Sequence, residues 1–255
     1  MNLTFAEYGF AMVGSFIAGS INTLAGNGSV ITLSILTDLI GLPGNLANGT
    51  NRVGVFLQAA GSAAGFHKNR NISLSEARPI IILTLAGALA GVYAATQVSN
   101  EQFLFVFRYL MLVMLLVILV KPERWIGPSD VRSLSQWIQV PAFLVLGFYG
   151  GFIQMGMGIF FLALLVLLSR YSIMEANAIK TLVIFIYSGV VLLIFAFTGL
   201  IEWKTGIIMA IGQTVGGYLT AYYAPKIPGI NLWAYRLLVV IVIFAILIQF
   251  DIIQV

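Results

Sequence analysis

The chain has 255 residues, of which 60% are hydrophobic and only 9% are charged, and it carries a net charge of +4. Because a soluble domain has roughly 25% charged residues, this composition excludes an ordinary soluble protein and predicts a membrane protein. The sequence contains no cysteine, which excludes disulfides, thiolate catalysis and cysteine-based metal sites.

Predicted membrane segments follow one another along almost the whole chain. The segments long enough to cross a bilayer alone are 46–66, 79–97, 103–120, 174–199, 205–223 and 232–250. Shorter segments form two pairs, 8–24 with 29–40 and 137–154 with 158–169. The first segment has Glu7 rather than a basic flank, so we expect no separable signal peptide.

A glycine break interrupts each pair, Gly26-Asn27-Gly28 in the first and Gly156-Met157-Gly158 in the second. As one straight helix, the first pair would be about 50 Å long, which exceeds the hydrocarbon core of about 30 Å. Each pair is therefore either one tilted, broken span or a re-entrant hairpin with the glycines at its tip. Two breaks at corresponding positions are typical of the binding site of a transporter.

The basic residues favour re-entrant hairpins, because short basic loops stay in the cytoplasm. With both pairs re-entrant, only Lys204 lies in a loop on the opposite side. The basic loop residues on the common side are then Lys68, Arg70, Arg78, Lys121, Arg124, Arg132, Arg170 and Lys226. If both pairs crossed fully, Lys204 would join this side, and Arg170 and Lys226 would leave it. The preferred topology places both termini outside the cytoplasm.

The two halves of the chain share a pattern of residues in the same order. The matches are Phe16-Ile17-Ala18-Gly19 with Phe148-Tyr149-Gly150-Gly151, Gly26-x-Gly28 with Gly156-x-Gly158, Ala47-Asn48-Gly49-Thr50-Asn51 with Ala176-Asn177-Ala178-Ile179-Lys180, and Gly87, Gly91 and Tyr93 with Gly212, Gly216 and Tyr218. One hairpin plus three spans reverses the direction of the chain, so the second half should be inverted. We expect an N-terminal membrane repeat at 1–120, a cytoplasmic linker at 121–135 and a C-terminal membrane repeat at 136–255.

The two glycine breaks are the first candidate binding elements. The helix that begins after each break offers backbone N–H groups and a partial positive charge, which favour an anion. Polar side chains near the breaks add donors: Asn22, Thr23, Asn27, Ser29 and Thr32 at the first, and Gln154 at the second. The alternative is that the glycines only permit close helix packing.

Cationic side chains inside predicted spans are the second candidate element. Arg52, which follows Thr50 and Asn51, and Lys180 in the other half lie several residues into their spans. A charge at such depth usually faces a cavity or a partner, although both side chains could instead reach the interface. The acidic residues fall in or near loops and termini, so these cations lack acidic partners and suit an ionised ligand. Gln213 adds a polar group at mid-span.

The residues described so far resemble one known family. Ala25-Gly26-Asn27-Gly28-Ser29, an apolar run, and then Gly41-Leu42-Pro43 with Ala47-Asn48-Gly49-Thr50-Asn51-Arg52 resemble the first half-motif of the TauE/SafE anion permeases, also called the toluenesulfonate uptake permease family. A second half-motif recurs between Gly150 and Thr181, with a shorter glycine run and with Ala178-Ile179-Lys180-Thr181 where the family has a Gly-Thr pair. The resemblance implies transport of sulfite, sulfoacetate and related organosulfonates.

These observations together predict an all-α polytopic membrane protein of two inverted repeats in the bacterial inner membrane. We expect a secondary transporter that exports a small sulfur-containing anion by alternating access, without cofactor, metal, catalytic residues or nucleic-acid partner. A homodimer is compatible with this expectation. The expected substrate-binding residues are Asn22, Gly26, Asn27, Gly28, Ser29, Thr50, Asn51, Arg52, Gln154, Gly156, Met157, Gly158, Lys180 and Gln213. The alternatives are an anion channel, an integral-membrane enzyme and a cation transporter.

Overall fold

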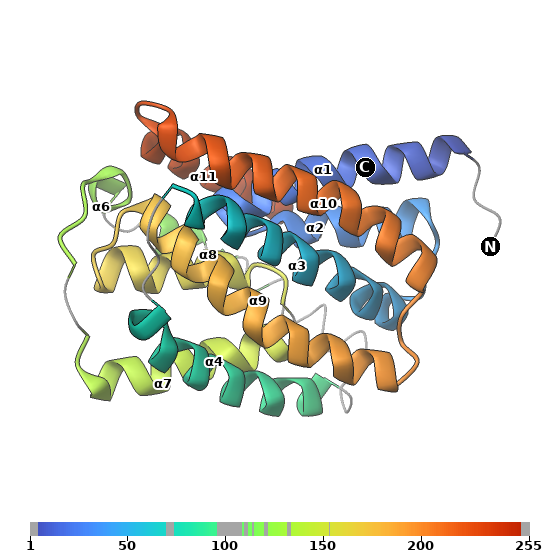
Figure 1. Ribbon diagram of the computed structural model, residues 1–255, viewed down its shortest axis with the longest axis horizontal. Helices are drawn as coiled ribbons and strands as arrows, with labels where there is room; N and C mark the ends of the chain where they lie inside the picture. Colours follow the sequence, from blue (N-terminus) through green and yellow to red (C-terminus); the bar gives the residue numbers. More distant parts are fainter. Residues whose placement is uncertain are drawn as a thin grey trace.

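The computed structural model describes residues 5–69, 74–95, 109, 112, 113, 115–119, 122–131, 134–152 and 154–250. Helices make up most of this part of the chain, which contains no β-strand (Figure 1). The α-helices are α1 (Phe5–Ala25), α2 (Gly28–Ser34), α3 (Gly44–His67), α4 (Leu74–Ala95), α6 (Pro122–Ile126), α7 (Gln136–Phe152), α8 (Met157–Ala163), α9 (Ile173–Phe197), α10 (Trp203–Tyr223) and α11 (Ile230–Gln249). Two π-helical turns, η1 (Ile35–Leu39) and η2 (Leu164–Leu168), extend α2 and α8, and the 3-10 turn η3 (Ala224–Lys226) follows α10.

The helices agree with the predicted apolar segments to within a few residues wherever the structure describes them. Within these ranges, α1, α4 and α9 contain windows long and apolar enough to cross a membrane, whereas the second arms of the glycine-broken pairs are shorter. The predicted span 103–120 lies mostly outside the described residues, as do Arg70, Lys121 and Arg132. The multi-pass helical architecture predicted from composition is therefore confirmed.

The first glycine-broken pair folds back on itself. A Cβ atom at Gly28 would lie 2.0 Å from the carbonyl oxygen of Ala18, and one at Gly14 would lie 2.6 Å from Cδ1 of Ile35. Residues late in the second arm therefore contact residues early in the first, as in an antiparallel hairpin. The second arm has seven α-helical residues and a five-residue π-helical turn, which makes it about 18 Å long. That length is too short to cross a hydrocarbon core of about 30 Å.

The second glycine-broken pair has the same form. The rings of Phe143 and Phe161 and those of Tyr149 and Phe160 each lie 5.5 Å apart between centroids, which places α8 back along α7. Its second arm also consists of seven α-helical residues and a five-residue π-helical turn. Each break is therefore the tip of a helical hairpin rather than a kink in one long helix.

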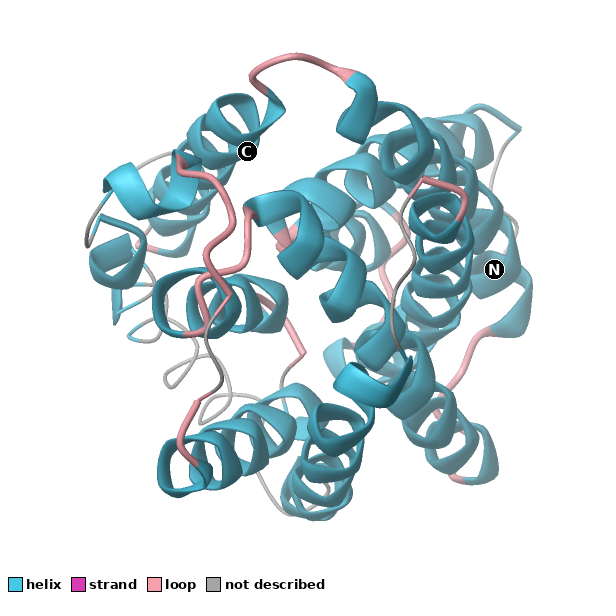
Figure 2. Cartoon of the chain, turned by 60° about the vertical axis from the view of Figure 1, so that its left-hand side comes forward, coloured by secondary structure: helices cyan, strands magenta, loops and turns pink. Residues whose placement is uncertain are grey.

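Two helix pairs, α1 with α10 and α4 with α7, pack through glycines at the same spacing. Added Cβ atoms would lie within 2.4 Å of a carbonyl oxygen at each of the following pairs: Gly212 on Met12, Gly216 on Phe16 and Gly19 on Gln213 between α1 and α10, and Gly87 on Leu144, Gly91 on Phe148 and Gly151 on Ala88 between α7 and α4. The helices run parallel in both pairs. Along α10, the contact of Gly212 with Met12 is followed by that of Gly216 with Phe16, and along α4, Gly87 with Leu144 is followed by Gly91 with Phe148. Glycine allows the backbones to touch at these points. The α4–α7 pair forms one edge of the bundle, and α1 and α10 lie toward the other (Figures 1 and 2).

Helices α3 and α9 meet antiparallel in the middle of the bundle (Figure 1). The rings of Phe56 and Phe185 stack with centroids 5.1 Å apart, while Phe66 near the end of α3 packs with Ala178 near the start of α9. Many large apolar side chains face outward instead, and Trp137 and Phe197 are each 89% exposed. Such an exterior is expected of a surface covered by lipid.

The predicted linker packs against the second half. Its helix α6 buries Trp125, whose ring lies 6.1 Å from that of Tyr235 on α11. Farther along, the Arg170 guanidinium donates to a carboxylate oxygen of Asp130 at 3.0 Å. The described part of the linker is therefore held against α11 and against the loop that follows η2.

Candidate functional site

The two hairpin tips touch each other through glycine. A Cβ atom at Gly26 would lie 2.5 Å from the carbonyl carbon of Gly158, and one at Gly158 would lie 2.5 Å from Cα of Gly26. Gly26 and Gly156 both have positive φ, at 79° and 71°, a conformation that glycine adopts without strain. These breaks therefore end the first arms and bring backbone from both halves into direct contact.

Asn27 is the polar residue at the tip contact that lacks hydrogen-bond partners. Its side chain is fully buried, and neither its amide nitrogen nor its amide oxygen has a partner among the described residues. Asn27 is the N-cap residue of α2, but its side chain makes no capping hydrogen bond. Buried polar atoms without partners are rare in native proteins, so the Asn27 amide is a candidate ligand contact.

Hydrogen bonds among α1, α2 and α3 hold the first tip in place. The Asn22 side-chain amide donates to the Gln58 side-chain oxygen at 2.7 Å, and the backbone N–H of Gly28 donates to the Asn22 side-chain oxygen at 3.3 Å. The Gln58 amide in turn donates to Thr23 at 2.9 Å and to Ser62 at 2.8 Å. Because Asn22 already takes the N–H of Gly28, that group is not free for a ligand in this state.

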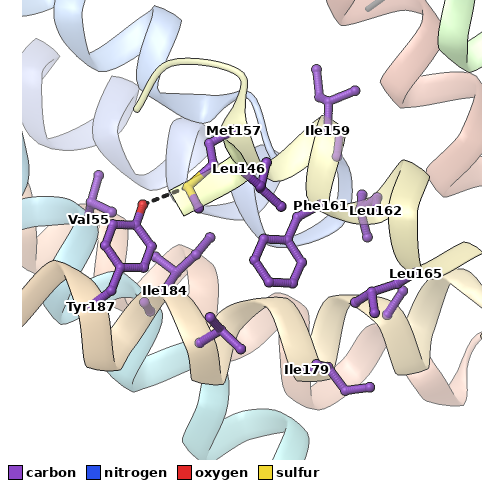
Figure 3. Packing of buried hydrophobic residues seen from close by; sticks show 14 of the residues in the cluster. Val55, Leu146, Met157, Ile159, Phe161, Leu162, Leu165, Ile179, Ile184 and Tyr187 are labelled. Carbon is purple, nitrogen blue, oxygen red and sulfur yellow. Dashed lines mark hydrogen bonds between the residues drawn. The ribbon is translucent and has the colours of Figure 1, made fainter. Parts of the chain in front are cut away.

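The second tip is apolar where the first is polar. Met157, which occupies the place of Asn27, accepts a hydrogen bond from the Tyr187 hydroxyl through its sulfur at 2.9 Å (Figure 3). Phe161 and Ile184 lie close by in the same buried cluster (Figure 3). Gln154 adopts a left-handed conformation with φ 62°, and its buried amide oxygen has no partner among the described residues. Strained non-glycine residues cluster at functional sites in proteins, which makes Gln154 a candidate site residue.

Gln213 brings a further amide to the contact between the halves. A Cβ atom at Gly54 would lie 2.0 Å from the side-chain nitrogen of Gln213, and one at Gly19 would lie 2.2 Å from the backbone oxygen of Gln213. The side chain is 3% exposed, and its amide nitrogen has no partner within the described ranges. Gly54 of α3 therefore makes room for this buried side-chain donor, and Gly19 of α1 makes room for the Gln213 backbone.

Arg52 caps the end of a helix in the other half. Its two terminal nitrogens donate to the carbonyl oxygens of Gly150 and Gly151 at 3.1 and 3.3 Å. These are the last carbonyls of α7, where the helix dipole places partial negative charge. The guanidinium also lies 5.3 Å from the ring centroid of Phe195, and its Nε has no partner in the described structure.

Lys180 caps the corresponding helix of the first half. Its ammonium donates to the carbonyl oxygens of Asn22 and Thr23 at 3.0 and 3.2 Å, and to the Asn177 amide oxygen at 2.5 Å. Asn177 donates in turn to the carbonyl oxygen of Leu24 at 2.9 Å. The last turn of α1 is thus bound by two side chains of α9.

The two caps are crossed between the halves. Arg52 of the first half binds the end of α7 in the second, while Lys180 of the second half binds the end of α1 in the first. The sequence predicts cations without acidic partners, and the side chains that the structure finds buried include no Asp, Glu or His. Helix carbonyls rather than carboxylates therefore balance both buried charges.

Other predicted site residues are engaged in hydrogen bonds with the chain itself. Thr32 donates to the Asn51 amide oxygen at 2.6 Å and also approaches the Ser29 carbonyl oxygen at 3.2 Å. Thr50 accepts from the backbone N–H of Glu202 at 2.9 Å, which places it at the start of α10 rather than at the tip contact. Among the predicted site residues, the buried N–H donors without a partner in the described structure are those of Asn27, Gln213 and Arg52.

Sequence reasoning missed several residues that shape this region. Gln58 and Ser62 follow Asn51 at spacings of seven and eleven, so they share its face of α3, and this spacing could have revealed them. Asn177 and Tyr187 act through contacts to the other half or to the tip. No local pattern in the sequence marks those contacts.

Comparison with known proteins identifies the group to which this fold belongs. A family model described as Sulfite exporter TauE/SafE matches residues 11–250. The chain belongs to the TauE/SafE family. The family resemblance stated from the glycine and asparagine motifs is thereby confirmed, and this TauE/SafE protein is a multi-pass membrane transporter.

Curated relatives of this TauE/SafE protein carry consistent names. A protein of Sinorhizobium sp. named probable membrane transporter protein ORF9 is 28% identical over 88% of this chain and 85% of its own length. Probable membrane transporter proteins of Haemophilus influenzae and of Escherichia coli K12 (YfcA) are 26% and 27% identical, over 81% and 79% of this chain and 80% and 75% of their own lengths. No solved structure gives a significant match.

Proposed function

We propose that this protein is a secondary transporter that exports a small sulfur-containing anion, such as sulfoacetate or sulfite, across the bacterial inner membrane. The observation that carries this proposal is the Asn27 side chain, which is fully buried at the contact of the two tips and has no hydrogen-bond partner among the described residues. The description of the family, Sulfite exporter TauE/SafE, supports the same substrate class. A sulfonate is ionised at neutral pH and has three acceptor oxygens, so amide donors and a nearby guanidinium suit it.

We propose that the anion binds between the tips, in contact with Asn27, Gln213 and the Nε of Arg52. Each of these has a buried N–H donor without a partner among the described residues. The contact of Gly26 with Gly158 opens when the ligand binds, and Gln154 and Met157 form the facing wall. Lys180 does not contact the ligand in this proposal, because oxygen atoms of the chain already accept its three N–H groups. It holds the end of α1 in place instead.

Alternating access would follow from inverted repeats, residues 1–120 and 136–255, joined by the linker at 121–135. The antiparallel packing of α3 on α9 supports inversion, because these helices contain the matched motifs of the two halves. The common register of α1 on α10 and of α7 on α4 supports a twofold relation between the halves. Rocking one hairpin and its partner helices would then open the tip contact to either side.

An anion channel with the same hairpins is the alternative function. The direct contact of Gly26 with Gly158 favours a transporter, because it closes the path between the tips in this state. Saturable exchange that stops without counter-substrate would support the transporter, whereas high conductance would support the channel.

A binding screen by calorimetry on the purified protein tests the proposed site. The screen compares sulfite, sulfoacetate, taurine, sulfate and acetate on the wild type and on Asn27→Ala, Arg52→Ala and Ser15→Ala. We expect sulfur oxyanions to bind more tightly than acetate, and Asn27→Ala to weaken binding by about ten-fold or more, because hydrogen bonds to a charged group contribute about 1.5–3 kcal/mol. Ser15→Ala is the matched control. It removes a different buried polar group, located on α1, that also has no partner among the described residues.

The screen separates the parts of the proposal. If no sulfur oxyanion binds more tightly than acetate, the substrate class is wrong. If sulfonates bind but Asn27→Ala retains wild-type affinity, the site does not lie at the tips. Unchanged affinity in Arg52→Ala would remove Arg52 from the ligand contacts and leave it a structural cap only.

A further inference from the structure

The two crossed caps differ in one chemical respect. The guanidinium of Arg52 stays protonated in proteins, whereas the ammonium of a lysine can release and regain a proton. Lys180 is 1% exposed, and its three acceptors are neutral oxygen atoms rather than a carboxylate. Lys180, the buried cation that caps the first hairpin, is therefore the one of the two that can change its charge.

The place of Lys180 resembles that of a coupling ion. In transporters with broken helices, the carbonyl ends of the half-helices coordinate the Na⁺ or H⁺ that drives transport. Here the end of α1 offers two carbonyl oxygens and α9 offers the Asn177 amide oxygen, all within 3.2 Å of one nitrogen. The ammonium thus occupies the position of a cation at the end of a half-helix.

One residue connects Lys180 to the proposed substrate site. The backbone oxygen of Asn22 accepts from Lys180, while the Asn22 side-chain oxygen accepts from the N–H of Gly28 at 3.3 Å. Gly28 directly follows Asn27 in the tip. A change of charge at Lys180 is therefore transmitted through Asn22 to the backbone that carries the unpartnered amide.

Few other charged groups face Lys180 from the helices around it. Arg52 of α3 is buried in the same bundle, and α9 itself contributes the hydroxyl of Tyr187. Helices α1, α4, α8 and α11 contribute no buried Asp, Glu, His, Lys or Arg among the side chains that the structure describes. Among the described residues of these helices, Lys180 is therefore the buried cation whose charge can change.

We propose that Lys180 carries the coupling proton of the transport cycle, an inference that rests on the proposed function. The protonated amine holds the end of α1 and locks the first tip. When the amine gives its proton to water on one side, the carbonyl end of α1 loses its balancing charge, and the hairpin is released. Uptake of one proton from the other side restores the lock, so one proton crosses in each cycle.

Proton counting in proteoliposomes tests this inference. Vesicles that contain a pH-sensitive dye receive a sulfoacetate gradient at neutral pH, where both acidic groups of sulfoacetate are ionised and the substrate brings no proton. We expect the wild type to move protons with sulfoacetate. Lys180→Arg, which keeps a permanent cation at the cap, should exchange sulfoacetate at a reduced rate with loss of proton movement. Lys226→Arg makes the same substitution at an exposed position and should keep the wild-type ratio.

The outcomes are distinct. Sulfoacetate flux without proton movement in the wild type would overturn the inference and leave the proposed function intact, even if Lys180→Arg does not fold. A wild-type proton ratio in Lys180→Arg would overturn it as well. Absence of any sulfur oxyanion flux in the wild type would overturn the proposed function, and this inference with it.

Discussion

At the scale of single residues, glycine determines how closely the two tips approach. Gly158 lies in the first turn of α8, where alanine would favour the helix by about 1 kcal/mol in an open site. At this site, however, the added Cβ would lie 2.5 Å from Cα and 2.6 Å from the carbonyl oxygen of Gly26, and backbone cannot move aside cheaply. We expect Gly158→Ala to destabilise the protein by about 1–3 kcal/mol and lower its melting temperature in detergent.

Gly9→Ala is the matched control for this prediction, because a Cβ atom at Gly9 would meet nothing within 4 Å. It should leave the melting temperature unchanged or raise it slightly. Equal stability of Gly158→Ala and Gly9→Ala would mean that the tips do not touch.

Residues at the tips were predictable from sequence to the extent that their chemistry is local. The breaks at Gly26 and Gly156 and the polar character of Asn27 can be read from the amino acids alone. The caps formed by Arg52 and Lys180 cannot, because their partners are carbonyl oxygens from the other half of the chain. Backbone acceptors leave no residue type to recognise, so a cation with carbonyl partners and one without any partner look alike in sequence.

At the scale of secondary-structure elements, the crossed caps stabilise the first arms of both hairpins. Arg52→Met would leave the carbonyls of Gly150 and Gly151 buried without their charged donor. We expect a loss of about 2–4 kcal/mol, because two hydrogen bonds to a charged group disappear and their acceptors stay buried. Thermal unfolding in detergent measures the effect, with Lys204→Met as control, since that lysine is exposed and its contact within the described structure is a cation–π contact with Tyr8. Similar stability of the two variants would contradict a structural role for the cap.

Element boundaries followed from apolar runs that end at glycine, proline or charge, and so they were predicted within a few residues. The hairpin form was one of two predicted alternatives, and its evidence is tertiary: Gly28 against Ala18 and Gly14 against Ile35. Helix α6 within the linker was not predicted, although Trp125 and Ile126 stand out there as apolar residues in a polar stretch.

At the scale of the whole molecule, exposed lysines lie at both ends of α10. Lys68 donates to the Tyr218 hydroxyl at 3.1 Å, and Lys226 lies 3.4 Å from the ring centroid of Tyr222, so both lie where α3 and α10 end. Lys204 lies at the start of α10, with its ammonium 5.0 Å from the ring centroid of Tyr8. Because basic ends stay in the cytoplasm, we expect the end with Lys68 and Lys226 to face inward.

The absence of cysteine makes this orientation directly measurable. In spheroplasts treated with a membrane-impermeant maleimide, Lys204→Cys should react, whereas Lys226→Cys should react only after the membrane is opened. Both positions are exposed, so differences in labelling report sidedness rather than burial. The reverse pattern would invert the proposed topology.

The most direct test of the central claim is a high-resolution structure of the protein with sulfoacetate. We predict that the sulfonate lies between the two tips, with an oxygen within hydrogen-bond distance of the Asn27 amide and with Arg52 and Lys180 still bound to the ends of α7 and α1. Sulfoacetate bound elsewhere, with Asn27 still unpartnered at the contact of Gly26 and Gly158, would contradict the account.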